Sequence, residues 1–103
     1  KNKYQSESDR LKNEGNIRIQ DAKDYAISYV DLKGDEISNE DIATIYPIFS
    51  ILNDYDNLIE ILNLSISRDD SNLEYLEVLR SAYMGKKDYE NAERIYQMIL
   101  SAE

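Results

Sequence analysis

Neither cysteine nor histidine occurs in the 103-residue sequence. Without them the chain has no disulfides, thiolate nucleophiles or imidazole bases, and it lacks the usual ligands of structural zinc and haem. Only three glycines are present, each isolated, so no glycine-rich loop is available to bind phosphate. These absences predict no enzymatic activity, no cofactor and no metal site.

Long hydrophobic runs are also missing. No apolar stretch approaches the roughly 20 residues that span a bilayer, and residues 1–10 contain no hydrophobic signal segment. We therefore expect no membrane insertion by this segment. The first residue is Lys1 rather than methionine, which indicates a fragment of a longer protein. The absence of disulfides suits either side of a membrane and leaves the compartment open, with the cytoplasm slightly favoured.

Positive charge is scarce. The chain carries 12 Lys and Arg against 21 Asp and Glu, a formal net charge of −9. Residues 34–79 hold eleven of the acids but only one base, Arg68. Binding of nucleic acid by neutralisation of phosphates is therefore not expected. The acidic middle is either a solvated surface that aids solubility or a face that selects basic partners.

An internal repeat is the most informative feature of the sequence. Residues 53–57 (NDYDN) align with residues 87–91 (KDYEN) at an offset of 34. Apolar residues on both sides keep the same offset: Ile42 with Leu76, Ile45 with Leu79, Ile48 with Ala82, Phe49 with Tyr83, Leu58 with Ala92, Ile61 with Ile95, Leu62 with Tyr96, and Ile66 with Leu100. Their spacing of three and four predicts one amphipathic helix before each Asp-Tyr turn and another after it.

Residues 75–100 resemble a tetratricopeptide repeat. The small residues Ala82 and Ala92 and the large residues Tyr83 and Tyr96 occupy that family's packing positions. The resemblance implies an all-α fold, a right-handed superhelix of about three stacked antiparallel helical hairpins with about six helices. Residues 1–103 then form a single domain with repeat units of about 3–36, 39–72 and 73–103. Leu58 departs from the pattern, because the family has a small residue there.

Local signals place the helix boundaries. Ser38 followed by Asp41 reads as a helix start, residues 70–72 offer further N-caps, and Gly34 reads as a helix end. Pro47 falls inside a predicted helix, so we expect a bend there, which either curves the stack or shapes a pocket. Residues 1–33 are either a hairpin with Gly15 at its turn or one long helix.

Two groups of side chains are expected to have structural rather than functional roles. Asp54 and Asp56 lie in a predicted turn, where an aspartate caps the following helix, so we read them as caps rather than metal ligands. Most of the tyrosines are expected to fill the core. The expected packing residues are Tyr25, Tyr29, Tyr83, Tyr89 and Tyr96, and the expected freer ones are Tyr4, Tyr46, Tyr55 and Tyr75.

The repeat frame predicts where a partner binds. Stacked hairpins form a concave groove lined by the first helix of each pair, which suits a peptide or a partner helix. Removing the core positions leaves a candidate peptide-binding set: Glu40, Thr44, Pro47, Ser50, Glu74, Glu77 and Ser81, with Ala43 and Val78 beside them. Because this set is acidic, a basic or amphipathic peptide is the expected partner.

The predicted function is therefore a protein–protein interaction module. Two alternatives stay open: a structural spacer or oligomerisation domain of a larger protein, and a peptide-sensing domain of a regulator. The last helix bears on the choice, because we expect Ile95, Met98, Ile99 and Leu100 to form a stripe that no further helix covers. Such a stripe predicts a homodimer through the last helix, further repeats, or a modest hydrophobic patch.

Overall fold

The computed structural model describes residues 20–102. A helix occupies residues 20–33 and a short 3-10 helix, η1, follows at Gly34–Glu36. Four further helices complete the described chain: α2 (Asn39–Ile51), α3 (Tyr55–Arg68), α4 (Leu73–Gly85) and α5 (Tyr89–Ala102). No strand occurs among these residues, so the all-α prediction is confirmed for them. The predicted hairpin turn at Gly15 lies outside the described residues.

The 34-residue period reappears in the positions of the helices. The bounds of α4 and α5 each follow those of α2 and α3 by 34 residues. Both hairpin turns also share one backbone geometry, with positive φ angles of 54° at Asn53 and 63° at Lys87. In each turn the N–H of the next residue bonds to a helix carbonyl at 2.9 Å, from Asp54 to Phe49 and from Asp88 to Tyr83.

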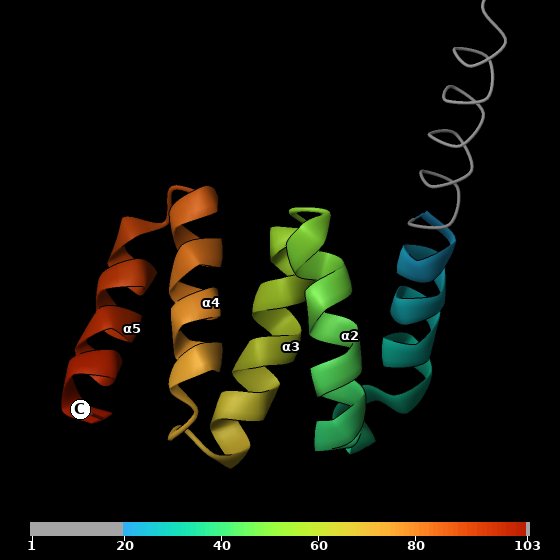
Figure 1. Ribbon diagram of the computed structural model, residues 1–103, viewed down its shortest axis with the longest axis horizontal. Helices are drawn as coiled ribbons and strands as arrows, with labels where there is room; N and C mark the ends of the chain where they lie inside the picture. Colours follow the sequence, from blue (N-terminus) through green and yellow to red (C-terminus); the bar gives the residue numbers. More distant parts are fainter. Residues whose placement is uncertain (1–19, 103) are drawn as a thin grey trace, which may run out of the picture.

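Consecutive helices pack side by side along the chain, α2 with α3, α3 with α4 and α4 with α5 (Figure 1). The core runs through these contacts. Its fully buried large side chains are Ile37, Ile42, Phe49, Leu62, Leu76, Leu79 and Ile95. All but Ile37 belong to the apolar stripes of the repeat, because residues three and four apart on a helix share one face. Ala26 is also fully buried, so the helix at 20–33 shares this core.

The predicted helix ends are confirmed at three places. Ser38 Oγ accepts a hydrogen bond from the Asp41 N–H at 3.1 Å and so caps α2. Asn72 Oδ1 does the same for α4 through the Tyr75 N–H at 3.2 Å. Gly34 has φ +54°, a left-handed conformation that glycine adopts without strain, and the helix at 20–33 ends directly before it. Pro47 lies inside α2, which continues through it to Ile51.

The predicted side-chain cap at Asp54 is not formed, although Asp54 holds the N-cap position of α3 and Asp56 lies in its first turn. Asp54 makes no side-chain bond to the start of α3; its Oδ2 accepts from Asn57 Nδ2 at 2.9 Å and lies 3.7 Å from Lys23 Nζ. Asp56 pairs with Lys86, which ties α3 to the end of α4. In the second hairpin, Asp88 does cap α5, because its Oδ1 accepts the Asn91 N–H. The side-chain and backbone hydrogen bonds from Asn91 hold the Asp88 pKa below its usual value.

The tyrosine assignment is also partly wrong. Tyr25 and Tyr89 are exposed, and Tyr96 is borderline exposed at 37%. In contrast, Tyr46, Tyr55 and Tyr75 pack against the core. A helical face alone does not decide burial, because a neighbouring helix must cover it.

The uncovered stripe on α5 is narrower than predicted. Ile95 and Ile99 are buried, and Met98 is half-buried against the core, since α4 packs along this side of α5. Leu100, at 44% exposed, is the member of the predicted stripe that stays open.

Loss of the α2 cap gives a first testable prediction. Ser38→Ala removes the oxygen that accepts the Asp41 N–H, so we expect a loss of about 1 kcal/mol in the free energy of unfolding. Ser28→Ala, on the exposed face of the helix at 20–33, is the matched control and should change stability by less than about 0.5 kcal/mol. Urea denaturation measures both. Equal effects at the two sites would show that Ser38 is not a cap.

Gly85 allows a close approach between α3 and α4 and gives a second prediction. A methyl group on Gly85 would overlap the ring of Tyr55. Alanine favours a helix over glycine by up to about 1 kcal/mol, so Gly85→Ala should stabilise a Tyr55→Ala chain. With Tyr55 present, the displaced ring should cancel that gain. A double-mutant cycle in urea should therefore give a coupling of about 1 kcal/mol, and additive effects would contradict the contact.

Candidate functional site

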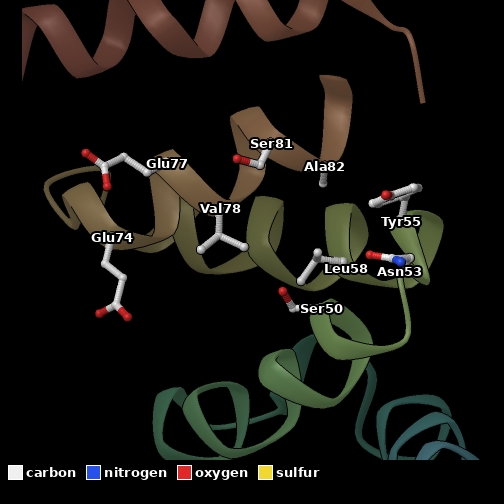
Figure 2. A pocket seen from close by; sticks show the side chains of 9 residues that line it. All are labelled: Ser50, Asn53, Tyr55, Leu58, Glu74, Glu77, Val78, Ser81 and Ala82. Atoms are coloured by element: carbon white, nitrogen blue, oxygen red, sulfur yellow. The ribbon is translucent and has the colours of Figure 1, made fainter. Parts of the chain in front are cut away.

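A cavity of about 340 Å³ lies where α2, α3 and α4 meet, and Figure 2 shows its lining. Three helices contribute, together with the turn that joins α2 to α3. The lining consists of Ser50, Asn53, Tyr55, Leu58, Glu74, Glu77, Val78, Ser81 and Ala82. We call this cavity the groove.

Local structure positions each part of the groove. The Asn72 cap starts α4, and the spacing from Glu74 to Val78 to Ser81 then puts these residues on one face of that helix. Opposite them, Ser50 lies in the last turn of α2, and the positive φ of Asn53 turns the chain so that α3 begins at Tyr55. The groove is therefore bounded by two first helices of hairpins and closed at one end by a turn.

The chemistry of the groove is divided between floor and rim. Leu58 and Ala82 are buried and Val78 is half-buried, so the floor is apolar. Glu74 and Glu77 are exposed, and Figure 2 shows them together at one end, away from Tyr55. No Lys or Arg belongs to the lining. The groove therefore combines an apolar floor with a negatively charged rim.

One of the rim acids is held in place by its neighbours. Tyr46 Oη donates a hydrogen bond to Glu74 Oε1 at 3.1 Å, and the Tyr46 ring meets the Tyr75 ring edge-on with centroids 5.0 Å apart. Burial, and then the bond to Glu74, raise the pKa of Tyr46 above its ordinary value. The phenol therefore stays protonated at neutral pH and continues to donate, which reduces the freedom of the Glu74 side chain.

The structure brings together part of the set predicted from sequence. Ser50, Glu74, Glu77 and Ser81 all line the groove. Pro47 is half-buried and Glu40 is exposed, and neither belongs to the lining. Ala43 and Thr44 are exposed on α2, outside the groove.

Sequence reasoning missed the end of the groove made by the turn and by α3. The sequence places Asn53 and Tyr55 at the turn and Leu58 in the apolar stripe, and it does not indicate that they line the groove. The sequence signal that could have found them is the repeat of residues 53–57 at 87–91. A repeated segment between two helices indicates a structured turn beside the first helix of each hairpin. A repeat alignment does not show which turn side chains reach across to the next hairpin.

A smaller cavity of about 180 Å³ contains Thr44. Its lining is Tyr25, Tyr29, Asp41, Thr44 and Ile45. Tyr29 Oη donates to Asp41 Oδ2 at 2.7 Å, and this bond is the main reason that the Asp41 pKa is lowered. Because the Asp41 carboxylate accepts the Tyr29 hydroxyl and the Asp41 N–H donates to Ser38 Oγ, the Tyr29–Asp41 pair is structural and ties the helix at 20–33 to α2.

Residues 20–102 offer neither a metal site nor a membrane-spanning helix. This part of the chain has no group of three or more carboxylate, imidazole or thiol side chains placed to hold a metal ion. It also has no helix that is long and apolar enough to cross a membrane. A hollow of about 450 Å³ beside the end of α5 has a more polar lining, made of Asp70, Ser71, Gln97, Met98, Ser101 and Ala102.

Comparison of the chain with protein-family models, with curated proteins and with solved structures finds no match.

Proposed function

We propose that this chain is a protein-interaction module, a tetratricopeptide-like superhelix whose groove binds a peptide or a helix of a partner protein. The observation that carries the proposal is the groove at the junction of α2, α3 and α4, with its apolar floor and acidic rim. The helix bounds that repeat every 34 residues support the family resemblance.

The partner that fits this groove is basic and amphipathic. Apolar side chains of the peptide would cover Leu58, Val78 and Ala82, and the free energy of binding would come mainly from this contact. Lys or Arg side chains would lie near Glu74 and Glu77, where opposite charge adds specificity and speeds association. Because both acids are exposed, their contribution should fall as salt screens it.

Binding explains the groove better than catalysis does. General acid–base catalysis needs a titratable group whose pKa is tuned by burial or by a close neighbour, held against the substrate. The two carboxylates of the lining are both exposed at the rim. The serines of the lining, Ser50 and Ser81, have no basic side chain among the lining residues to activate them.

A peptide-display selection on the immobilised 103-residue chain tests the proposal. We expect the selected peptides to carry apolar residues at helical spacing together with Lys or Arg. The same selection on a Val78→Lys chain, in which the floor carries a charge, should not enrich these sequences. A library that yields no enriched sequence, or the same sequences on both chains, would count against the groove as a binding site.

A structural or assembly role is the second candidate, and the exposed face of α5 favours it. Tyr89, Tyr96 and Leu100 are all exposed on this last described helix. A homodimer that forms through α5 would bury them. Sedimentation equilibrium separates the candidates, because a dimer that persists in high salt and is lost in Leu100→Glu would favour assembly over peptide binding.

A further inference from the structure

The 34-residue period pairs each position of α5 with a position of α3, and the paired positions differ in exposure. Tyr89, Tyr96 and Leu100 correspond to Tyr55, Leu62 and Ile66. The α3 residues are covered: Leu62 is fully buried, and Tyr55 and Ile66 pack against the core. The α5 residues are all exposed. We call Tyr89, Glu90, Tyr96, Gln97 and Leu100 the outer face of α5.

Three contacts show that α4 is the element that covers this face on α3. The ring of Tyr55 lies against Gly85, with no room for a side chain there. Asp56 forms an ion pair with Lys86, and Asn63 Nδ2 donates to Tyr83 Oη at 3.0 Å. The start of α3 thus meets the end of α4, so the two helices are antiparallel.

The same chemistry is present on α5. Tyr89 corresponds to Tyr55, Glu90 to Asp56 and Gln97 to Asn63, so the ring, the acid and the amide recur in order. The first helix of each hairpin extends the pattern: Arg80 corresponds to Tyr46, which bonds to Glu74 in the first turn of α4. Arg80 is exposed and its guanidinium lies over the Tyr96 ring, 4.9 Å from the centroid. An acid at the start of an incoming helix would meet it.

We propose that the outer face of α5 binds an amphipathic helix of a partner protein, antiparallel to α5, in the manner in which α4 covers α3. The contacts on α3 define the features of that helix. It has an apolar face with residues at spacing three and four, and an acid in its first turn that faces Arg80. It also has a small residue opposite Tyr89 and a base opposite Glu90. This site is separate from the groove and does not depend on peptide binding there.

The chemistry favours this occupant over a second copy of α5. In an antiparallel α5 the residues opposite Glu90 would come from the last turn of the helix, which carries no base to pair with it. The α5 helix also contains no glycine to let the backbone approach the Tyr89 ring. The charges of the outer face therefore match a helix of the α4 type.

The probe is a labelled synthetic peptide that copies residues 71–87, which contain α4, and the readout is fluorescence anisotropy with the 103-residue chain. In the folded chain the face on α3 is already occupied by α4, so the peptide is left with α5. We expect saturable binding, and we expect Leu100→Glu in the chain to weaken it about tenfold or more, as for a central contact of an interface. Leu32→Glu, at an exposed leucine on the helix at 20–33, should leave binding unchanged.

A second peptide tests the direction of the charges. A Glu74→Lys/Lys86→Glu peptide has the same composition and net charge as the parent but reverses both ends, and it should bind about tenfold more weakly. Circular dichroism checks that each protein variant folds. Three results would overturn the proposal: no binding, equal binding of the two peptides, or binding that Glu74→Lys/Glu77→Lys in the chain abolishes while Leu100→Glu does not. A dimer of the chain alone that Leu100→Glu dissociates would overturn it as well, in favour of a second copy.

Discussion

Leu62→Ala is expected to lower the free energy of unfolding by about 2–5 kcal/mol, the usual cost of removing a buried leucine side chain. Leu62 is fully buried on the side of α3 that α4 covers, so the loss combines the transfer free energy of the removed atoms with the cost of a cavity between the two hairpins. Small domains have only about 5–15 kcal/mol of stability in total. This one substitution should therefore consume a large part of it.

Leu100→Ala is the matched control for Leu62→Ala. It removes the same atoms from the equivalent side of α5, where the leucine is exposed, and it should cost less than about 1 kcal/mol. Urea denaturation of the two variants, with the slope of the transition unchanged, measures the difference. Similar losses of stability at the two sites would show either that α4 does not cover this face of α3 or that the equivalent face of α5 is covered.

Charge reversal at the rim of the groove should have the largest effect on binding. Glu74→Lys/Glu77→Lys changes the local charge by four units and puts two bases where a basic peptide needs acids. We expect the affinity for a selected basic peptide to fall at least about tenfold at low salt, because like charges repel and Glu74 also loses its bond from Tyr46. The difference should shrink at about 0.5 M NaCl, where the screening length is only a few ångströms.

Glu90→Lys/Glu93→Lys is the control for the charge reversal. It makes the same change in net charge on exposed positions of α5, away from the groove lining. Its effect on peptide binding should be small and should come only from the weaker overall attraction. Isothermal titration calorimetry at two salt concentrations compares the variants. If both double substitutions weaken binding equally, the rim acids do not recognise the peptide.

The positions of the helices could be predicted from the sequence because they depend on local information. The 34-residue period and the apolar spacing of three and four are visible without any tertiary contact. The caps at Ser38 and Asn72 are equally local, since a side chain bonds to a backbone N–H three residues ahead. For that reason the bounds of α2 to α5 agree with the repeat frame.

Burial could not be predicted as well, because it depends on which face a neighbour covers. Tyr55 and Tyr89 are equivalent in the repeat, yet one packs against Gly85 and the other is exposed. Asp54 and Asp88 are likewise equivalent, but only Asp88 caps its helix, whereas Asp54 lies close to Lys23. Gly85 belongs to the next hairpin and Lys23 to the helix at 20–33, and an alignment of the repeat with itself includes neither contact.

The residues of the candidate site also divide into those that helical spacing predicts and those that depend on packing between hairpins. Glu74, Glu77 and Ser81 were placed on one face by helical spacing, and they do line the groove. Tyr55 and Leu58 were missed because they approach α4 from the neighbouring hairpin. Helix packing decides where the wall of a cavity lies. The sequence period specifies only which face of each helix points toward its neighbour.

The central claim, that the groove binds a basic amphipathic peptide, is tested most directly by nuclear magnetic resonance of the ¹⁵N-labelled chain during titration with a selected peptide. The account predicts saturable shifts of backbone amides around Ser50, Asn53, Val78 and Ser81, with α5 positions such as Gln97 unchanged. Shifts confined to α5, or the absence of saturable shifts in the groove, would contradict it.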